Sequence, residues 1–502
     1  MAEIFDLAVV GGGINGCGIA RDAAGRGLSV YLCEKGDLGG ATSSASTKLL
    51  HGGLRYLEHY EFRLVREALA EREVLWSIAP HIVRPMRFVL PHVAGMRPRW
   101  MLRTGLFIYD HLGGRAALPG TTSVDLDKGL LAQGLRPEFT RGWEYSDCWV
   151  EDNRLVVLNA QAARASGAEI ASRTEARTIA VRDGLWSVET VDQATGVARE
   201  IRARVLVNAA GPWAEKVAAK LVGRPPKGRV RMVQGSHVVV RRLYEHDRCF
   251  IFQNPDGRIV FTIPYEDDFT LIGTTDRDYD GDLDRVRASK EEISYLCAAA
   301  GAYFRRPLAP ADVVWSYSGV RPLYDDGASA AQAATRDYVL ELDRTGGAPM
   351  LSIFGGKITT YPRLAEEAID RIAPCFEDAR ADRLRAAAGW TGRTALPGGD
   401  FAPADVSGLV ASLADACPGL GRREATRLVR YYGTRAETIF GGGTFADLGH
   451  HFGRGLTERE LDHMRTEEWA QTAEDVLWRR SKLGLHLDPA AIRSEEHTSE
   501  LQ

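Results

Sequence analysis

The chain has 502 residues, and this length predicts about two to four structural units because domains usually hold roughly 100–200 residues. Hydrophobic residues make up 45% and charged residues 26%, values that exclude a disordered or fibrous chain. The 63 Lys and Arg residues stand against 67 Asp and Glu, a formal net charge of −4, so no global basic field favours nucleic acid as a partner.

The seven cysteines are scattered and form no C-x-x-C pair. This usage is typical of a reducing compartment and predicts neither a disulfide framework nor a metal site. The N-terminal stretch runs directly into an apolar strand without the charged start of a signal peptide, and no run of 18 apolar residues could span a bilayer. We therefore expect a protein of the cytoplasmic side.

The first elements follow a strand–helix–strand pattern. An apolar strand over 6–10 precedes a helical pattern, and a second strand over 28–33 ends at Glu34. Three glycines with the spacing G-x-G-x-x-G join the first strand to the helix: Gly11, Gly13 and Gly16. Such glycines allow a tight turn, the helix start offers unpaired N–H groups to a pyrophosphate, and Glu34 can accept a hydrogen bond from a ribose hydroxyl. The pattern predicts a dinucleotide cofactor and leaves NAD and FAD open.

An amphipathic helix is predicted over 62–76, and strand-like sequence follows from about residue 87. Residues 97–110 are predicted to form a basic, aromatic helix with three arginines, Trp100 and an apolar face. This mixture fits a helix lying in a membrane interface. It also fits a helix that packs on the core with a basic outer face, and the sequence alone favours this second interpretation.

Two later segments return the chain to the first domain. Strands over 170–207 end in Asn-Ala-Ala-Gly211-Pro-Trp213, at the expected nucleotide crevice, after a predicted helix over 155–165. A last apolar strand ends in Gly355-Gly356 before a helix, a turn suited to the pyrimidine edge of a flavin. Adjacent glycines can instead be packing turns, but the two returns together favour FAD.

The predicted fold is α/β, with a Rossmann-like FAD-binding domain interleaved with a mainly antiparallel substrate-domain sheet, plus a helical C-terminal cap. The expected boundaries are 1–78, 150–228 and 346–385 for the FAD-binding domain, 79–149 and 229–345 for the substrate domain, and 386–490 for the helical domain. The helical domain includes a predicted capping box, Thr457-x-x-Glu460. The tail over 493–502 is polar and aperiodic, and we interpret it as a non-native or disordered terminus.

Several further motifs are distributed along the chain: ATSSASTK over 41–48, LHGGLRY over 50–56, NAAGPW over 208–213, GVRP over 319–322, TRD over 335–337, GGKITT over 355–360 and EDVLWRRS over 474–481. Together with the glycine motif, they make the chain resemble the aerobic, FAD-dependent glycerol-3-phosphate dehydrogenases, within the glycine/D-amino-acid oxidase-like flavoproteins. The resemblance extends from the start to about residue 487. The serine-rich segment joined to His-Gly-Gly-Leu-Arg-Tyr is the most specific part, because amino-acid oxidases lack it as a unit.

The resemblance implies oxidation of sn-glycerol 3-phosphate to dihydroxyacetone phosphate, with hydride passing from C2 to FAD. It also implies electron transfer to quinone, peripheral attachment to the inner face of the cell membrane, and a homodimer. No metal is expected. The residues expected to bind the cofactor are Gly11, Gly13, Gly16, Glu34, Ser43, Ser44, Ser46, Lys48, Gly211, Trp213, Gly355, Gly356 and Thr359.

A phosphate dianion needs fixed cations, best supplied by guanidinium groups. Arg55, Arg321 and Arg336 lie in the matched motifs and are the candidates. Most arginines are ordinary surface residues, but the Gly-Val-Arg-Pro setting of Arg321 predicts a structured turn. Tyr56 is expected to orient the substrate or to act as a plain aromatic neighbour.

Loss of the C2 hydroxyl proton calls for a base. His51, in Leu-His-Gly-Gly, is the first candidate, and His237, in Gln-Gly-Ser-His, is the alternative. A single histidine is more often a structural hydrogen-bonding residue. Lys357 is placed to hydrogen-bond the reacting oxygen or to stabilise negative charge on the reduced flavin, unless it is a helix-start lysine facing water.

Other functions share much of this sequence pattern. A glycerol-3-phosphate oxidase that uses oxygen would share every substrate residue and differ only in its electron acceptor. An amine or amino-acid oxidase would use the same fold, although three guanidinium candidates favour a phosphate over a carboxylate. A flavin-binding sensor would not need His51, Arg321 and Lys357 together.

Overall fold

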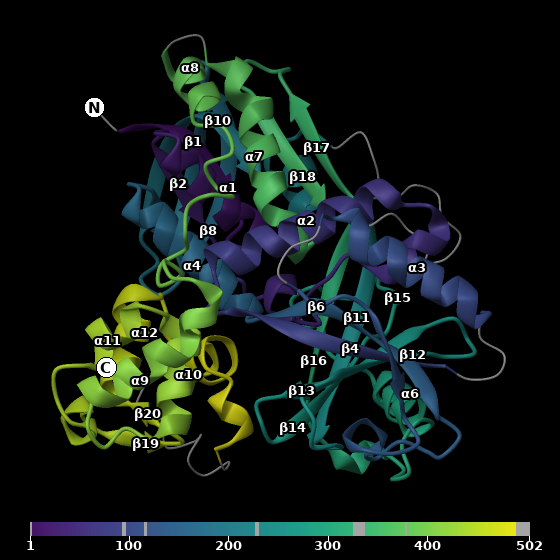
Figure 1. Cartoon of the computed structure of the whole chain (residues 1–502). Coiled ribbons are helices and arrows are strands. Elements are labelled where there is room, and N and C mark those ends of the chain that lie inside the picture. The colour runs from purple at the N-terminus through teal and green to yellow at the C-terminus, as the bar shows by residue number, and fades with distance from the viewer. Residues whose placement is uncertain are drawn as a thin grey trace.

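The computed structural model describes residues 3–92, 97–114, 118–225, 230–324, 337–376 and 379–487. These residues form two large β-sheets and a C-terminal helical region, each with its own buried hydrophobic cluster. Figure 1 shows the first sheet at the top, the second sheet at the lower right and the helical region at the lower left. This arrangement confirms the predicted fold class.

The first sheet has eight strands in the order β17–β18–β10–β1–β2–β7, with β9 and β8 attached beside β10. Their bounds are β1 (Ile4–Val10), β2 (Val30–Cys33), β7 (Glu169–Ala171), β8 (Thr174–Arg182), β9 (Leu185–Asp192), β10 (Ala198–Asn208), β17 (Tyr338–Asp343) and β18 (Met350–Gly355). β1 pairs in parallel with β2 and β10, and β10 pairs in parallel with β18. Because parallel strands end at the same edge of a sheet, Gly11, Glu34, Ala209 and Gly356 follow their strands at one edge.

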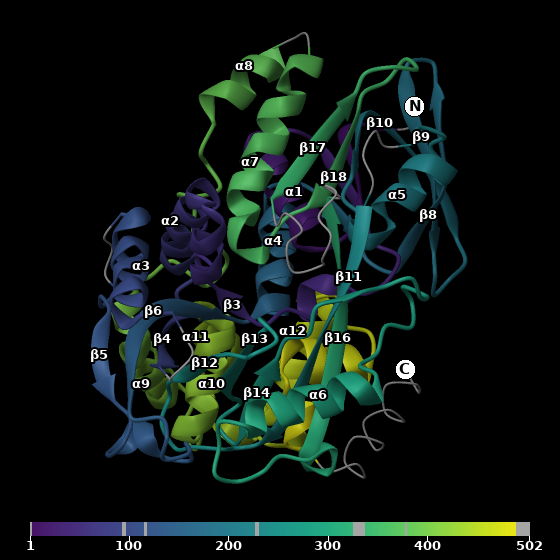
Figure 2. The same cartoon turned by 90° about the vertical axis from the view of Figure 1, so that its right-hand side faces the viewer.

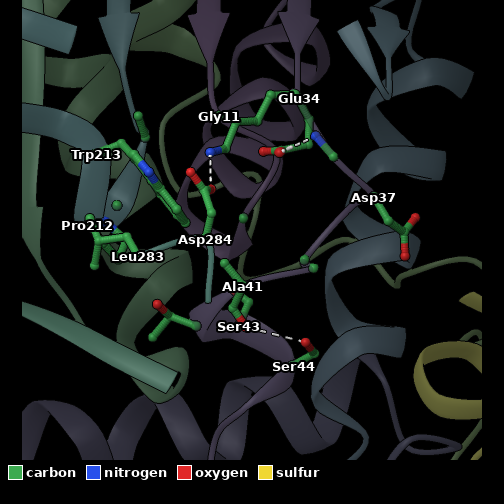
Figure 3. A pocket seen from close by; sticks show the side chains of 18 of the residues that line it. Gly11, Glu34, Asp37, Ala41, Ser43, Ser44, Pro212, Trp213, Leu283 and Asp284 are labelled. Carbon is green, nitrogen blue, oxygen red and sulfur yellow. Dashed lines mark hydrogen bonds and ion pairs between the residues drawn. The ribbon is translucent and has the colours of Figure 1, made fainter. Parts of the chain in front are cut away.

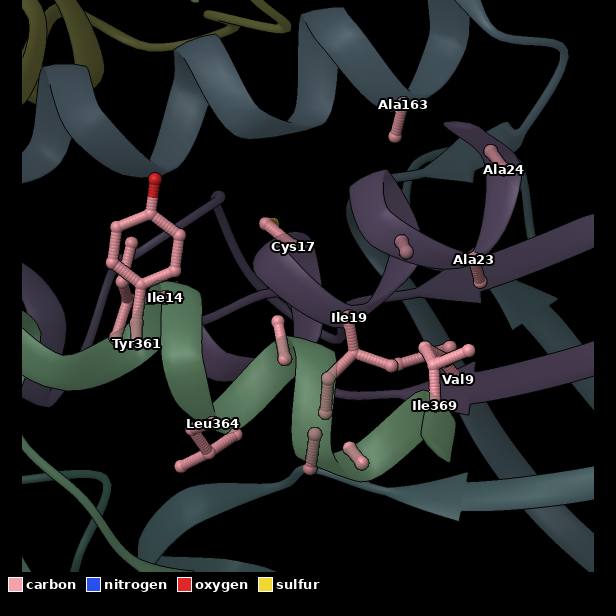
Figure 4. Packing of buried hydrophobic residues seen from close by; sticks show 14 of the residues in the cluster. Val9, Ile14, Cys17, Ile19, Ala23, Ala24, Ala163, Tyr361, Leu364 and Ile369 are labelled. Atoms are coloured by element: carbon pink, nitrogen blue, oxygen red, sulfur yellow. The ribbon is translucent and has the colours of Figure 1, made fainter. Parts of the chain in front are cut away.

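Three helices cover one face of this sheet: α1 (Ile14–Gly25), α4 (Asp152–Ala165) and α7 (Tyr361–Ile372). α1 lies between α4 and α7, and Figure 4 shows Ile19 of α1 beside Ile369 of α7, with Ala163 of α4 on the other side. A Cβ at Gly18 would lie 2.7 Å from Tyr361, so α1 needs small residues to pack this closely. This packing fixes the N-terminus of α1 at the carboxyl edge of the sheet.

The second sheet has ten strands in the order β15–β11–β14–β13–β12–β4–β6–β3, with β16 beside β11 and β5 beside β6. Their bounds are β3 (Leu49–Leu50), β4 (Val83–His92), β5 (Thr122–Asp125), β6 (Arg141–Val150), β11 (Val230–Arg241), β12 (Cys249–Gln253), β13 (Ile259–Tyr265), β14 (Phe269–Gly273), β15 (Arg277–Asp278) and β16 (Val313–Tyr324). β12 and β4 are parallel, and the other pairs are antiparallel. The expected mainly antiparallel sheet is therefore present.

Three helices accompany the second sheet: α2 (Phe62–Ile78), α3 (Arg99–Leu112) and α6 (Lys290–Gly301). α2 connects the two cores, because Val65 and Leu69 belong to the cluster of the second sheet while Leu75 and Ile78 belong to that of the first. α3 matches the helix predicted over 97–110 to within two residues.

Two strands lie across the predicted domain boundaries. Residues 338–343 are predicted in the substrate sheet, but β17 pairs antiparallel with β18 at the edge of the first sheet. Leu49 and Leu50 are predicted in the FAD-binding domain, but β3 pairs with β6 of the second sheet. The reason is that an apolar pattern identifies a strand and not its partner.

The C-terminal region contains α9 (Val406–Ala416), α10 (Arg422–Tyr432), α11 (Arg435–Phe440), α12 (Glu458–Glu467) and the short pair β19 (His451–Gly453) and β20 (Leu456–Thr457), after α8 (Ala379–Ala386). Thr457 Oγ1 accepts a hydrogen bond from the N–H of Glu460, as the capping box predicts. The Glu460 carboxylate instead binds Arg427 and Tyr432 inside the domain. In the part of the chain described here, every helix is too short or too polar to cross a bilayer.

Candidate active site

A cavity of about 1400 Å³ opens at the carboxyl edge of the first sheet. Figure 3 shows Trp213, Pro212 and Leu283 on one side of it, and Glu34 and Asp37 on the other. Its wall combines segments far apart in the sequence: the first glycine turn, the loop after β2, residues 41–45, residues 209–213, the β16 residues 315–320 and several residues between 473 and 479. Its volume exceeds the roughly 300–1,000 Å³ of an ordinary ligand pocket, which leaves room for an extended dinucleotide.

The first glycine turn packs too closely for side chains. Gly11 has a φ of +112°, and a Cβ there would lie 2.5 Å from the carbonyl oxygen of Ala209. A Cβ at Gly16 would lie 1.9 Å from the carbonyl oxygen of Gly11. Glycine at position 11 therefore lets the turn after β1 approach the end of β10, and glycine at position 16 lets α1 approach that turn.

Glu34 is held in place by the backbone on both sides of it. Its Oε2 accepts a hydrogen bond of 2.7 Å from the N–H of Gly12, and its Oε1 accepts one of 2.8 Å from the N–H of Gly36. Burial raises the pKa of this carboxyl, and the two N–H groups oppose that shift. Each carboxylate oxygen has a second lone pair, so Glu34 can still accept a hydrogen bond from a ribose hydroxyl.

The serine-rich segment has two parts with different roles. Ser43 lines the cavity and accepts a hydrogen bond of 3.0 Å from the N–H of Ile14 at the start of α1, and Ser44 also lines the cavity. Ser46 and Lys48 direct their side chains to Asp152, the first residue of α4, with Ser46 Oγ and Lys48 Nζ each 2.8 Å from the carboxylate. Both are expected to bind the cofactor, but in the structure their side chains hold the segment against α4.

Gly211 and Trp213 lie on the cavity wall. A Cβ at Gly211 would meet no protein atom within 4 Å, so the backbone there borders open space that a ligand can approach. The Nζ of Lys35 lies 4.0 Å from the ring centroid of Trp213 and 2.5 Å from Asp284.

The second glycine turn lies against the first. Gly355 and Gly356 have φ values of +75° and +94°, and Thr359 is buried in the turn that follows. Asn15 of α1 donates a hydrogen bond of 3.3 Å from Nδ2 to the carbonyl oxygen of Gly355. The two turns that the sequence assigns separately to the cofactor are thus joined directly.

Three of the predicted substrate residues gather beside the second turn. Lys357 Nζ lies 4.1 Å from the centroid of the Tyr56 ring, and His51 makes an edge contact with Phe261. Burial, together with the positive charge of Lys357, lowers the pKa of His51 to about 3. His51 is therefore neutral at pH 7, so its imidazole has a free nitrogen lone pair for a hydrogen bond from a hydroxyl group, while so low a pKa makes it a weak base.

A second group surrounds Arg321 on β16. Arg321 Nη1 donates to Asp276 at 2.6 Å, and Nη2 donates to Thr274 at 3.3 Å. His237 is fully buried, its Nε2 lies 2.9 Å from Thr47 Oγ1, and its ring stacks on Tyr317 with centroids 4.8 Å apart. Burial and the nearby charge of Arg321 hold the pKa of His237 well below its usual range.

The two groups share one face of the second sheet. Phe261, Gly273, His237 and Tyr317 are successive cross-strand partners on β13, β14, β11 and β16. Cross-strand partners point to the same side of a sheet, and Tyr317 lines the cavity. The structure therefore brings His51, Lys357, Tyr56, His237 and Arg321 to one side of the second sheet.

Arg55 and Arg336 are the remaining phosphate candidates. Arg55 is half-buried next to Tyr56 in the 3₁₀ helix η2 (Leu54–His59). Arg336 lies outside the described residues.

Comparison with known families agrees with this geometry. Residues 6–362 match the family model described as FAD dependent oxidoreductase. The chain belongs to this FAD-dependent oxidoreductase family. Residues 390–500 match a second model, the C-terminal domain of alpha-glycerophosphate oxidase, which corresponds to the helical C-terminal region.

Relatives of this oxidoreductase cover nearly its full length. The glycerol-3-phosphate dehydrogenase of Pseudomonas aeruginosa is 52% identical over 98% of this chain and 94% of its own. The aerobic glycerol-3-phosphate dehydrogenase of Escherichia coli is 49% identical over 97% and 95%, and the D-erythritol 1-phosphate dehydrogenase of Brucella abortus is 49% identical over 97% and 96%. The glycerol-3-phosphate dehydrogenase of Bacillus halodurans, solved with FAD, has a TM-score of 0.73 and 25% identity, covering 99% of this chain and 90% of that chain.

The site of this FAD-dependent oxidoreductase fits its cofactor. The glycine turn, the serine-rich segment and residues 209–213 line one continuous cavity, and the backbone at Gly211 faces open space. Seven of the residues expected to bind the cofactor line this cavity: Gly11, Gly13, Glu34, Ser43, Ser44, Gly211 and Trp213. Gly355 is joined to the start of α1 by the hydrogen bond from Asn15, and Gly356 and Thr359 follow it in the second glycine turn.

Four residues that sequence reasoning missed support the site: Asn15, Asp152, Asp276 and Tyr317. Asn15 and Tyr317 had a signal, because one lies inside the glycine motif and the other just before Gly-Val-Arg-Pro. Asp152 and Asp276 had none, because their roles depend on which distant segment each one meets.

Proposed function

We propose that the protein oxidises sn-glycerol 3-phosphate to dihydroxyacetone phosphate with FAD as the hydride acceptor. The observation that carries the proposal is a fixed guanidinium, Arg321, on the same face as the neutral imidazole of His51. These groups suit a substrate that carries a phosphate and loses a hydroxyl proton. The names of the Pseudomonas and Escherichia relatives support the same substrate.

In this proposal Arg321 binds the phosphate, and Asp276 fixes its orientation through the 2.6 Å contact. Arg55, next to Tyr56 in η2, is the second cation of the proposal. Bound FAD supplies the hydride acceptor for the hydrogen on C2. His51 takes the proton from the C2 hydroxyl, while Lys357 hydrogen-bonds that oxygen and Tyr56 holds the ammonium group in place.

A longer polyol phosphate is the second candidate substrate. The Brucella relative is as similar to this chain as the Escherichia relative, and its name specifies D-erythritol 1-phosphate. Both substrates carry a phosphate and a secondary alcohol, so Arg321 and His51 would serve either one. The length of the site beyond the reacting carbon decides between them.

Anaerobic addition of sn-glycerol 3-phosphate to the purified yellow protein is expected to bleach the visible flavin band. D-erythritol 1-phosphate and a glycine control are compared at equal concentration by stopped-flow absorbance. Faster bleaching by the erythritol ester would reassign the substrate, and bleaching by glycine alone would reject a phosphate substrate. A yellow protein that none of them bleaches would overturn the proposal.

The proposal extends to a quinone acceptor at the inner face of the cell membrane, supported by α3. This helix buries Leu102, Leu106 and Tyr109 against the protein, as its core-packing interpretation predicts. It also exposes Trp100 by 68% and Phe107 by 62%. Exposed aromatic residues beside basic ones are typical of a helix in a membrane interface.

Neighbouring residues enlarge this exposed face. Arg99 and Arg103 are exposed on α3, and Arg97 is exposed just before it. An ion pair of 3.2 Å between Arg97 and Glu58 ties the start of α3 to η2. Tyr60, which directly follows η2, is 81% exposed. The basic and aromatic groups together suit an anionic lipid surface. The homodimer remains a prediction.

The double variant Trp100→Ala, Phe107→Ala is expected to bind phosphatidylglycerol-containing vesicles at least about tenfold more weakly than the wild type, because two exposed aromatic groups are lost. Co-sedimentation measures the bound fraction, and Val197→Ala, which removes an exposed apolar residue between β9 and β10, is the control. Equal binding of the double variant and the wild type would remove the membrane assignment. The rate of turnover with a soluble quinone is then compared with the rate with oxygen. A faster rate with quinone indicates a dehydrogenase, and a faster rate with oxygen indicates an oxidase.

A further inference from the structure

The C-terminal helical region reaches the cofactor cavity through one short segment. This segment, the π-helical η11 (Asp475–Arg480), contributes Leu477, Trp478 and Arg479 to the cavity wall. Trp478 stacks on Trp315 of β16, with ring centroids 4.7 Å apart and an interplanar angle of 26°. The cavity is therefore completed by a domain separate from the two sheets.

Asp37 is the main attachment point for η11. Arg480 binds both carboxylate oxygens of Asp37, with Nη1 and Nη2 each at 2.7 Å, and Arg479 Nε lies 2.6 Å from Asp37 Oδ2. Asp37 is 5% exposed and Arg480 1% exposed. A two-pronged guanidinium–carboxylate pair of this kind fixes orientation as well as charge.

Asp37 lies in the loop that follows β2, between Glu34 and the serine-rich segment. The N–H of Gly40 donates to the Asp37 carbonyl oxygen, and the N–H of Gly39 donates to the Gly12 carbonyl oxygen, each at 2.9 Å. The loop over 34–40 is thus tied to the glycine turn at one end and to η11 at its centre. A shift of Asp37 would move the cavity wall around Glu34.

A second contact ties the same segment to Arg173, in the turn between β7 and β8. Asp475 Oδ2 accepts a hydrogen bond of 2.6 Å from Arg173 Nη2, and the N–H of Arg173 donates to the Gly36 carbonyl oxygen at 2.9 Å. Arg173 itself lines the cavity. η11 therefore holds both loops that border this part of the cavity.

We propose that the Arg480–Asp37 pair is a positioning device for FAD, through which the C-terminal domain holds the 34–40 loop in its cofactor-binding conformation and slows FAD release. Arg480 acts from behind the cavity wall, where it also binds Asn153 of α4 and the Glu468 carbonyl oxygen. FAD binding and docking of the C-terminal domain are then coupled, and each strengthens the other.

The test compares holoprotein variants by their FAD dissociation constant, measured from flavin fluorescence on dilution and by equilibrium dialysis. Arg480→Met is expected to weaken FAD binding by about tenfold or more, a typical coupling between two sites. Arg480→Lys keeps the charge but loses the planar fork, so an intermediate weakening is expected. The control is Arg427→Met, which breaks the partly buried Arg427–Glu460 pair of the same domain, whose contacts are also 2.7 Å.

A wild-type dissociation constant for Arg480→Met would overturn the proposal. Equal weakening by Arg427→Met would also overturn it, because the effect would then come from general loss of domain stability. If Arg480→Met does not fold, Asp37→Asn, which keeps the side-chain shape, carries the same expectation. No substrate is present in this measurement, so its failure leaves the proposed reaction untouched, and failure of the flavin-bleaching experiment leaves this coupling untouched.

Discussion

Replacing Arg321 by alanine is expected to lower kcat/KM for sn-glycerol 3-phosphate by roughly 30- to 4000-fold, which corresponds to about 2–5 kcal/mol for loss of a hydrogen-bonded charge pair. Asp276 and Thr274 hold the guanidinium on the face of β16 that also carries Tyr317, so its orientation is set before the phosphate arrives. Steady-state kinetics measure the loss, and the flavin spectrum shows whether FAD is retained. Flavin content is expected to stay normal.

Two companion variants sharpen this prediction. Arg321→Lys keeps the charge and loses the fork, so partial activity is expected. Arg231, on the neighbouring strand β11, carries another guanidinium, which binds Asp278. Arg231→Ala is the control and is expected to leave kcat/KM nearly unchanged. A near-normal kcat/KM for Arg321→Ala would mean that another cation binds the phosphate, and Arg55 would be the next candidate.

The sequence was most informative where the functional residues lie close together along the chain. The strand, the glycine spacing and Glu34 all lie within the first 34 residues, and the structure places them together at one sheet edge. Two features allowed this: a parallel strand pair has its carboxyl ends together, and a glycine turn is required where backbone segments approach closely. The type of fold followed from the same local patterns.

Contacts between distant segments were beyond such reasoning. Lys48 belongs to a motif expected to bind FAD, yet its ammonium group lies against Asp152, 104 positions away. β17 reads as a strand from its alternating pattern, but only the hairpin with β18 shows which sheet it joins. A local sequence pattern predicts the conformation of a segment, but it says little about which other segment the first one pairs with.

The substrate residues fall between these two cases. His51, Lys357 and Arg321 were selected singly from motifs, and their common position on one face depends on the register of β11, β13, β14 and β16. The depressed pKa of His51 likewise arises from burial near Lys357, a residue far away in the chain. The chemistry of each residue could be predicted from its type, whereas the effect of one charge on the pKa of another residue could be seen only in the folded structure.

Replacing Gly16 by alanine is expected to give a colourless protein without bound FAD and with a lowered Tm. The new Cβ would lie 1.9 Å from the Gly11 carbonyl oxygen, an overlap that only displacement of α1 or of the glycine turn relieves. Either displacement moves the helix N-terminus that is placed to face the pyrophosphate. Flavin absorbance per polypeptide and thermal unfolding measure the two effects.

The matched control is Gly408→Ala in α9, where a Cβ would meet no atom within 4 Å. There the change favours the helix by about 0.5–1 kcal/mol, because alanine loses less backbone entropy than glycine. Normal flavin content is expected for this control, with an unchanged or higher Tm. A yellow Gly16→Ala protein with one FAD per chain would mean that the close approach of α1 to the end of β1 is not what shapes the cofactor site, and the assignment of the glycine motif would then have to rest on Gly11 and Glu34 alone.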